Sequence, residues 1–423
     1  MAQNTSNQQS TLNGLFKQVY AKSVKTAIPN FAILQARLPF SKAAILGDKY
    51  HLPVVLSDEH GFTYGGSAGA NYTLNSAVSL QMQDAQVPGS ELTLQSGMSY
   101  GAVSRAQSKG STAVEGAVGI LIERMKASTA KRVEIAMIYG GSGIGQIVST
   151  STTGSAGTRV YTISTSSFAA GIWAGLENAN LDLYTTGGSK LNTNSGVVIT
   201  AVSVGLKTVT ISGNSADLTA IDAATNPKIY FMGTFGNEMT GLDQIMINTG
   251  VLFNIDASAY NLWAAQTYDC LSSALTMNKV LSAVNLAVGR GLMQDVQLLV
   301  AADSWANLNA NLAGQRMFDG SYKSSKAENG VESIKYHSSN GMIEVICHPF
   351  VKSGEAFLLP LDNVQRVGST DIDFRGDGPD GQQEYLVQNP TTNGWICRAY
   401  TDQAVLIETP AMTVKLINIT ATP

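Results

Sequence analysis

Apolar residues recur every three to four positions over residues 111–138. Val114, Val118, Leu121 and Ile122 begin a stripe that fits one face of a helix. Thr112 and Glu115 fit a capping box at its start. At 1.5 Å per residue such a helix spans about 42 Å, well above the usual length of roughly 11–12 residues. The pattern therefore predicts a structural beam.

Ahead of this helix, residues 50–104 alternate between apolar and polar side chains, which predicts an elongated two-stranded hairpin. Its expected parts are a β-rich run (His51–Leu56), a turn-prone tip (Gly61, Gly65, Gly66, Gly69), a return strand (Leu74, Val78, Leu80), a break at Pro88-Gly89, and a resumption over Glu91–Gln95. The hairpin has too few apolar residues for a core of its own. We therefore expect it to lie on another surface, such as a neighbouring subunit.

After the helix the chain becomes rich in Ser, Thr and Gly over residues 142–235. Arg159–Thr165 and Lys207–Ser212 alternate as half-buried strands do. This stretch predicts an inserted small β domain of antiparallel strands.

The remainder mixes helical and extended patterns. Helices are expected over Gly241–Asn248, from a Thr276 cap to Val288, and over Ser304–Leu312 with Asp303 as cap. Strands are expected at Val296–Ala302, Ile343–Cys347, Ala356–Leu359, Tyr385–Gln388, Trp395–Thr401, Val405–Thr409 and Met412–Ile419. Near the N-terminus, Leu15–Tyr20 suits a short helix, and Pro29 and Pro39 bracket an extended segment. Strand–helix alternation followed by strands predicts an α+β fold.

Composition narrows the class of protein. The chain has 423 residues, enough for two or three structural units, and 44% of them are apolar. Only 14% are charged, against about 25% in an average domain. A lightly charged surface suits a protein that is covered by copies of itself. A Thr/Gly-rich extracellular adhesin has a similar composition, so composition alone leaves both open.

Charge is unevenly distributed within a net of −4. Residues 1–47 contain Lys17, Lys22, Lys25, Arg37 and Lys42, and the first carboxylate is Asp48. Such a basic arm can bind nucleic acid or an acidic partner; a merely solvated terminus has the same composition.

Cysteine usage and hydropathy bear on location. Cys270, Cys347 and Cys397 are far apart and odd in number, which predicts reduced, buried thiols in a protein made in a cytoplasm. The first residues do not resemble a signal peptide, which counts against an adhesin. No stretch approaches the roughly 18 apolar residues of a membrane span.

No motif for catalysis or for binding a cofactor or metal has its residues at the required spacing. Gly140–Gly145 lacks the third glycine of a dinucleotide fingerprint, and Asp371–Gly381 lacks the ligands of a calcium loop. The four histidines show neither metal nor triad spacing, and His348 is expected to be a satisfied core or edge residue. We therefore predict no catalytic, cofactor-binding or metal-binding residue, and no enzyme.

The order of parts resembles the major capsid proteins of tailed bacteriophages, with the Hong Kong 97-type coat fold that encapsulin shells share in outline. Residues 236–256 and 275–305 resemble segments of such coats. The resemblance divides the chain into an N-terminal arm (1–39), an extended loop or E-loop (40–104), a peripheral domain with the spine helix (105–141), the inserted β domain (142–235), a peripheral return (236–261), an axial domain (262–370) and C-terminal peripheral strands (371–423).

This resemblance implies a coat protein that forms the hexamers and pentamers of an icosahedral shell around double-stranded DNA. It implies assembly in the host bacterial cytoplasm, a separate scaffold protein, a portal and a decoration protein, with no membrane and no cofactor. The basic arm would face DNA or scaffold. Some relatives cross-link an E-loop lysine to a neighbour's asparagine, but residues 50–104 contain no lysine, so a non-covalent shell is expected. The alternatives are an encapsulin-like compartment shell and, further off, a β-rich adhesin.

Overall fold

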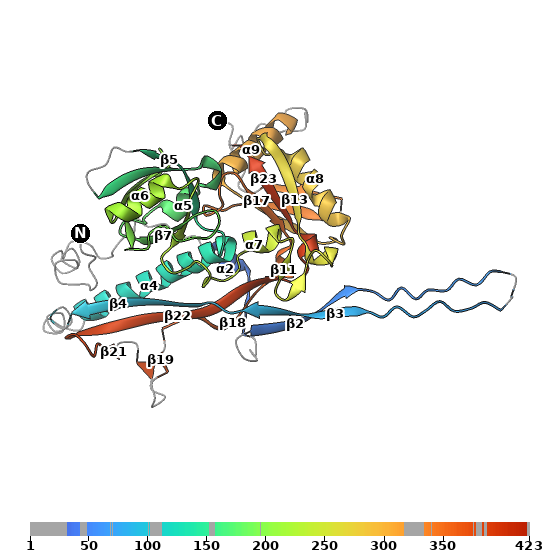
Figure 1. Cartoon of the computed structure of the whole chain (residues 1–423), viewed down its shortest axis with the longest axis horizontal. Helices are drawn as coiled ribbons and strands as arrows, with labels where there is room; N and C mark the ends of the chain where they lie inside the picture. The colour runs from blue at the N-terminus through green and yellow to red at the C-terminus, as the bar shows by residue number, and fades with distance from the viewer. Residues whose placement is uncertain are drawn as a thin grey trace, which may run out of the picture.

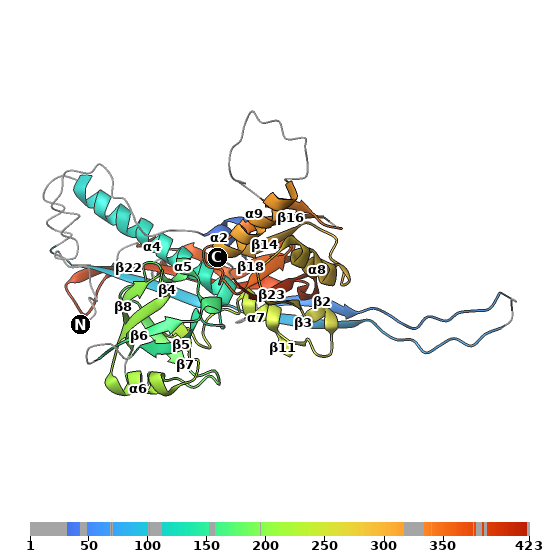
Figure 2. The ribbon, with the colours of Figure 1, turned by 90° about the horizontal axis from the view of Figure 1, so that it is seen from above.

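The computed structural model combines a body of helices and sheets with one long hairpin that projects from it (Figures 1 and 2). It describes residues 32–42, 49–67, 69, 71–99, 101, 112–151, 157–194, 196–316, 334–339, 341–374, 376–377, 383–384 and 387–420. The predicted helix at Leu15–Tyr20 and the side chains of the predicted capping box lie outside this description. The mixed content of helix and strand confirms the α+β prediction.

A single helix, α4 (Thr112–Tyr139), confirms the predicted beam. It packs on a sheet with the strand order β1-β18-β22-β21, to which β4 is added along β22. These strands are β1 (Phe40–Lys42), β18 (Val364–Asp373), β22 (Gly394–Ile407), β21 (Val387–Gln388) and β4 (Glu91–Ser99). The sheet thus joins segments from both ends of the chain.

Two predicted strands, Trp395–Thr401 and Val405–Thr409, are in fact one strand, β22. Polar residues Asp402 and Gln403 lie between the two predicted strands. The Gln403 side chain is buried, accepts a hydrogen bond from Arg366 Nη1 (3.0 Å) and donates one to Thr401 Oγ1 (2.7 Å). Burying the Gln403 amide costs little free energy because both its oxygen and its nitrogen have hydrogen-bond partners. Strand β22 therefore continues through this residue.

The hairpin pairs β2 (Lys49–Ser57) with β3 (Gln81–Pro88). The predicted return strand at residues 74–80 is extended but lies outside the paired ladder, which begins at Gln81. The prediction that Glu91–Gln95 resumes the hairpin is wrong, because these residues belong to β4 and pair with β22. We call residues 49–88 the hairpin and residues 58–80 its extension.

The segment between Pro29 and Pro39 was expected to be extended, but it contains the short helix α2 (Ile33–Arg37). The buried carboxylate of Glu134 on α4 accepts hydrogen bonds from Leu34 N (2.5 Å) and Gln35 N (2.9 Å). A helix begins here because a side chain 100 residues away satisfies its first amides.

The inserted β domain is a closed barrel with the strand order β10-β5-β6-β9-β8-β7, and all its pairs are antiparallel, as predicted. Its strands are β5 (Gly145–Ser151), β6 (Thr158–Ile163), β7 (Asn180–Tyr184), β8 (Val197–Ser203), β9 (Thr208–Ser212) and β10 (Lys228–Phe231). Three helical segments accompany them: η1 (Thr165–Ser167), α5 (Ala170–Trp173) and α6 (Ser215–Ala223). Helix α6 was not predicted; the Asn214 side chain caps it by accepting from Ala216 N (2.9 Å).

A second sheet has the order β13-β23-β17-β14-β16-β15 and its own apolar core with α8. Its strands are β13 (Gln266–Ser273), β14 (Val296–Val300), β15 (Ile334–His337), β16 (Met342–Cys347), β17 (Ala356–Leu359) and β23 (Val414–Ile419). The helices beside it are α8 (Met277–Val288) and α9 (Ala302–Arg316). Helix α9 begins before Asp303, which therefore lies in the first turn and is not the cap. Thr276 is the N-cap residue of α8 but forms no side-chain cap bond.

Shorter elements complete the described chain: α7 (Leu242–Ile247), β11 (Val251–Leu252), β12 (Ile255–Asp256), η2 (Asn261–Trp263), η3 (Leu361–Asn363), η4 (Pro410–Met412), β19 (Gly376–Asp377) and β20 (Gln383–Glu384). Helix α7 confirms the short helix predicted over 241–248. Cys347 is exposed, contrary to the expectation of three buried thiols, whereas Cys270 and Cys397 are buried.

Candidate functional site

The extension exposes large apolar side chains that the described part of the chain leaves uncovered. The exposed fractions are 69% for Phe62, 92% for Tyr64, 57% for Tyr72 and 74% for Leu74. Figure 1 shows why: both legs of the extension run away from the body into solvent. Apolar side chains gathered on one projecting element are typical of an interaction surface.

Glycines let the two legs approach each other. A Cβ on Gly61 would lie 3.1 Å from the backbone of Ala77 and Val78, so a larger residue would push the legs apart. The ring of Tyr72 covers Gly65 in the same way. Asn75 ties the legs by donating from its backbone N to Thr63 Oγ1 (2.8 Å) and from Nδ2 to the Phe62 carbonyl (2.7 Å).

The base of the hairpin is held firmly, in contrast to its tip. Ala85 and Val87 of β3 are buried. The tight turn between β11 and β12 abuts β3: the Phe253 carbonyl accepts from Gln86 N at 2.9 Å, and Asn254 Nδ2 donates to the Asp84 carbonyl at 3.4 Å. The direction of the hairpin is therefore set by the body.

The hairpin carries an unusual charge pattern. Its acidic residues are Asp58, Glu59 and Asp84, and its only Lys or Arg is Lys49 at the first position of β2. Lys49 Nζ donates to Gln86 Oε1 (3.4 Å), and His51 Nδ1 lies 2.5 Å from Asp84 Oδ2. The extension therefore presents apolar and acidic groups but no cation.

The predicted basic arm is only partly within the description. Lys17, Lys22 and Lys25 lie outside the described residues. Arg37 forms an ion pair with Glu344 of β16, with Nη1 3.0 Å from Oε2 and a second contact of 3.4 Å. Lys42 is exposed on β1. The structure thus assigns Arg37 an acidic partner within the same chain and leaves Lys42 open to solvent.

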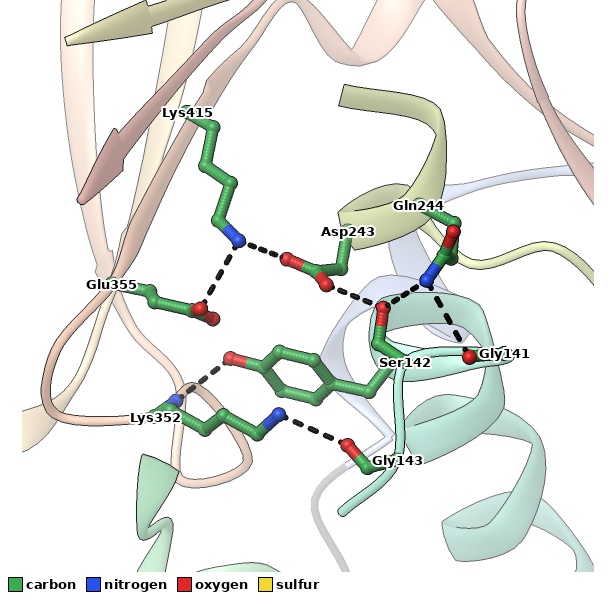
Figure 3. A network of polar contacts seen from close by, with 9 residues as sticks. Gly141, Ser142, Gly143, Asp243, Gln244, Lys352, Glu355 and Lys415 are labelled. Atoms are coloured by element: carbon green, nitrogen blue, oxygen red, sulfur yellow. Dashed lines mark hydrogen bonds and ion pairs between the residues drawn. The ribbon is translucent and has the colours of Figure 1, made fainter. Parts of the chain in front are cut away.

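A buried polar network joins the end of α4 to α7 and to the second sheet (Figure 3). Lys415 of β23 binds Asp243 of α7 and, at 3.0 Å, Glu355. Ser142, just after α4, donates to the other oxygen of Asp243. Lys352 adds a second cation and donates from Nζ to the Gly143 carbonyl at 2.9 Å.

The protonation of this network follows from its charges. Burial by itself lowers the pKa of Lys415, but the carboxylates of Glu355 and Asp243 outweigh it and raise the pKa above the ordinary value. Burial raises the pKa of Asp243, but the Lys415 and Lys352 charges lower it below the ordinary value. The network is therefore a charged junction that fixes how three parts of the body meet.

Glu134 of α4 belongs to a second buried polar cluster. Glu134, which caps α2, also lies 2.9 Å from His348 Nε2, and both side chains have an exposed fraction of 0%. His348 is thus a satisfied core residue, as predicted. The network and this cluster were not predicted, because their residues are far apart in the sequence and no local motif connects them.

Chemistry of a catalytic kind is not evident in this geometry. Among the described residues, no group of three His, Cys, Asp or Glu side chains could hold a metal ion. No helix in the described part of the chain is long and apolar enough to cross a membrane. A cavity of about 140 Å³ between β4, α4 and residues 232–239 is lined by Arg132 and Glu238. Burial lowers the pKa of Arg132 to about 10, opposed by the charge of Glu238. The Arg132 guanidinium also lies over the Phe231 ring, 3.2 Å from its centroid.

The sequence matches no protein-family model, and it matches no curated protein. Its structure does have counterparts. The chain superposes on the capsid subunit of cyanophage A-1(L) with a TM-score of 0.52 at 10% identity, covering 95% of both chains. The chain has the fold of phage capsid proteins.

A capsid subunit of a native GTA particle gives a TM-score of 0.50 at 9% identity, covering 95% of this chain and 94% of the other. An encapsulin from Synechococcus elongatus covers 95% of this chain and 94% of its own, but its TM-score is 0.38 at 11% identity. At 9–10% identity, the similarity to the two capsid subunits establishes the fold of this chain but not its role. The encapsulin superposes too loosely to support a conclusion about this chain.

Proposed function

We propose that this chain is the major capsid protein of a tailed bacteriophage, a shell subunit without enzymatic activity. The observation that carries the proposal is the extension, whose apolar side chains are exposed in the single chain. Exposed apolar side chains of this kind mark a surface that contacts another protein, and further copies of the same subunit can supply that contact. The capsid fold supports the same function, because it spans 95% of this chain and of the cyanophage subunit.

In this function the hairpin overlaps a neighbouring copy, and the copies form hexamers and pentamers of an icosahedral shell around double-stranded DNA. The parts then take the roles of N-terminal arm, E-loop, peripheral domain, inserted β domain and axial domain. A separate scaffold protein, a portal and a decoration protein complete the particle, which assembles in the host cytoplasm. The light charge of the chain, 14% of its residues, supports close packing of copies.

Assembly of the purified full-length chain tests this proposal. We expect uniform shells, hexamers or pentamers by negative-stain microscopy and sedimentation, with or without an added scaffold protein. A variant in which Asn-Gly replaces residues 60–78 should fold but not assemble. Leu206→Ser, which removes an apolar side chain that is 75% exposed on the barrel, is the matched control and should assemble normally. Strict monomers under all conditions would overturn the proposal.

The basic arm faces the particle interior in this scheme, where Lys17, Lys22, Lys25 and Lys42 meet phosphates or an acidic scaffold. Charge reversal of Lys17, Lys22 and Lys25 to Glu should reduce genome content or particle yield while the thermal midpoint of the subunit stays unchanged. Arg37→Gln should instead lower that midpoint slightly, because it breaks the exposed pair with Glu344, a pair of a kind worth roughly 0–1 kcal/mol.

The shell is held without covalent cross-links in this proposal, because no lysine lies between Tyr50 and Ser104. Particles boiled in detergent should release one band near 44.6 kDa. A ladder that survives boiling and reducing agent would contradict this and direct attention to Lys42 and Lys49.

A further inference from the structure

Lys415 is held between two carboxylates in the buried network (Figure 3). Its Nζ contacts Asp243 Oδ1 and lies 3.0 Å from Glu355 Oε1. The side chains of Lys415 and Asp243 are only 5% and 7% exposed, and that of Glu355 is 22% exposed. One amine nucleophile therefore touches an acyl group on one side and a general base on the other, with little water present.

Three separate elements hold this geometry. Asp243 lies in the first turn of α7, Lys415 lies inside β23, and Glu355 immediately precedes β17. Strand β23 pairs with β13 on one side and with β17 on the other, so its backbone is fixed. Groups held in contact in this way react as though present at about 10⁵ M or more. The fold thus keeps the amine permanently against the Asp243 carboxylate.

The second oxygen of Asp243 is prepared to carry negative charge. Ser142 donates its hydroxyl hydrogen to Oδ2, and Gln244 Nε2 donates to Ser142 Oγ at 3.0 Å. The positive charge of Lys352 also acts on Asp243. Attack of an amine on Cγ moves electrons onto this oxygen, and a donor already in place stabilises that charge without rearrangement.

The charges of the pair set the direction and the speed of such a reaction. Burying an ammonium and a carboxylate costs hydration free energy, and a neutral amide that keeps Glu355 and Ser142 as partners removes both charges. Burial lowers the pKa of Lys415, but the carboxylates of Glu355 and Asp243 raise it above the ordinary value. The amine is therefore neutral only a small fraction of the time, and the reaction is slow compared with folding.

We propose that Lys415 and Asp243 become joined within one chain by an isopeptide bond, with Glu355 as the general base. Glu355 Oε1 accepts a proton from the Nζ ammonium, and the freed lone pair of Nζ attacks Cγ of Asp243. The Cγ–Oδ1 bond then breaks, and Oδ1 leaves as water with the two protons that Nζ loses. Oδ2 remains as the amide oxygen, Glu355 ends as it began, and nothing is oxidised or reduced.

The bond ties α7 to β23 across 172 positions of the sequence. It forms once per chain, so it makes the protein no enzyme. It is also independent of the proposed shell function, because all three groups belong to one copy. Boiled particles would still release a single band, and the chain would differ only by the loss of one water molecule. Until the bond forms, the pair remains ionised.

Intact-mass spectrometry of the full-length chain tests the proposal. The folded chain is incubated for increasing times, denatured and weighed, and a matched sample is kept in denaturant from lysis onward. We expect the folded sample to become lighter by one water molecule, whereas the denatured sample keeps its full mass. Proteolysis of the lighter species should give a branched peptide that contains both Lys415 and Asp243.

Four variants assign the roles. Lys415→Arg keeps the positive charge but cannot form the amide, and Glu355→Gln removes the base, so both should keep their full mass. Asp243→Asn should lose ammonia in place of water, because the leaving group is then an amide nitrogen. Lys352→Met is the control, since it removes the other buried lysine of the network and should still lose water, although more slowly.

The decisive measurement uses the unaltered chain, so it does not depend on whether a variant folds. An unchanged mass of the folded chain after prolonged incubation would overturn the proposal, whether or not shells form. A loss of water that persists in Lys415→Arg, or that yields no branched peptide, would overturn it as well, because the water would then come from another site. Persistence of the loss in Glu355→Gln would overturn the role of Glu355 as the base.

Discussion

The barrel and the hairpin are both antiparallel β structures with few charges, but they satisfy their strands differently. The barrel closes through β10-β5-β6-β9-β8-β7, which leaves no edge, and its inward side chains, such as Tyr161, Val209 and Ile211, are fully buried. The hairpin has two strands and an extension whose apolar side chains face water. Closure makes a β element self-sufficient, whereas an open ribbon depends on a partner.

The largest difference in the free energy of unfolding should come from replacing one aromatic residue in the barrel and one in the extension. Trp173 is fully buried in the barrel core, stacked 6.4 Å from Phe168. Trp173→Ala should lower the free energy of unfolding by about 3–5 kcal/mol. Tyr64→Ala in the extension should change it by less than about 0.5 kcal/mol but should impair assembly. Chemical denaturation and sedimentation measure the two effects. Comparable losses of stability in both variants would contradict the view that the barrel is self-sufficient and the extension is not.

The junction in Figure 3 tests whether the barrel is independent of the rest of the body. Lys415→Met removes the cation that contacts the buried carboxylate of Asp243 and the partly buried carboxylate of Glu355, and Lys352 remains as the other cation of the network. Breaking a buried pair in this way costs about 3 kcal/mol or more. Hydrogen exchange should show loss of protection in the second sheet while the barrel strands stay protected. Simultaneous loss in both would mean that the barrel depends on the junction.

Replacing a glycine in each region should give a smaller difference in stability of the same sign. A Cβ on Gly145 in the barrel would lie 2.9 Å from the Trp173 ring and 3.2 Å from Ile163, both buried. Gly145→Ala should therefore cost about 1–3 kcal/mol through overpacking. The three atoms nearest to a Cβ on Gly65 all belong to the Tyr72 ring, which is exposed and can move. Gly65→Ala should change the thermal midpoint little, and a large fall would show that the extension is ordered on its own.

Low pH should have the smallest effect on stability, and it should act through Asp182 in the barrel and Asp243 in the body. Burial raises the pKa of Asp182, but hydrogen bonds from Lys190, Gly233 and Asn192 lower it below its ordinary value; the pKa of Asp243 is also lowered. Carboxyls of this kind contribute stability above the ordinary Asp value of about 3.9. That stability is lost as pH falls through the lowered pKa.

The thermal midpoint should accordingly be insensitive to these two residues from pH 7 to about 5 and should fall below about pH 4. Asp182→Asn should flatten that acid fall. An unchanged acid profile in this variant would show that Asp182 contributes nothing to the pH dependence.

Local pattern determined much of this molecule. The β nature of residues 142–235, helix α8 and strand β17 follow from short windows of sequence, because their side chains face one consistent environment. The bounds of α4 were predicted as well, but an apolar stripe on one face does not describe its C-terminal end, where Val133–Tyr139 are all buried. The absence of cations from residues 50–104 is likewise a property of the sequence alone. The sequence alone also predicted that the chain divides into a hairpin, a helix, a β insertion and a mixed remainder.

Tertiary structure decided what local pattern could not. Helix α2 exists because Glu134 supplies its cap from 100 residues away, and β22 runs through Gln403 because Arg366 and Thr401 satisfy that buried amide. Strand β4 is not part of the hairpin, because it pairs along its whole length with β22, about 300 residues downstream. In each case at least one of the hydrogen bonds comes from a residue far away in the sequence, and no window of neighbouring residues contains that information.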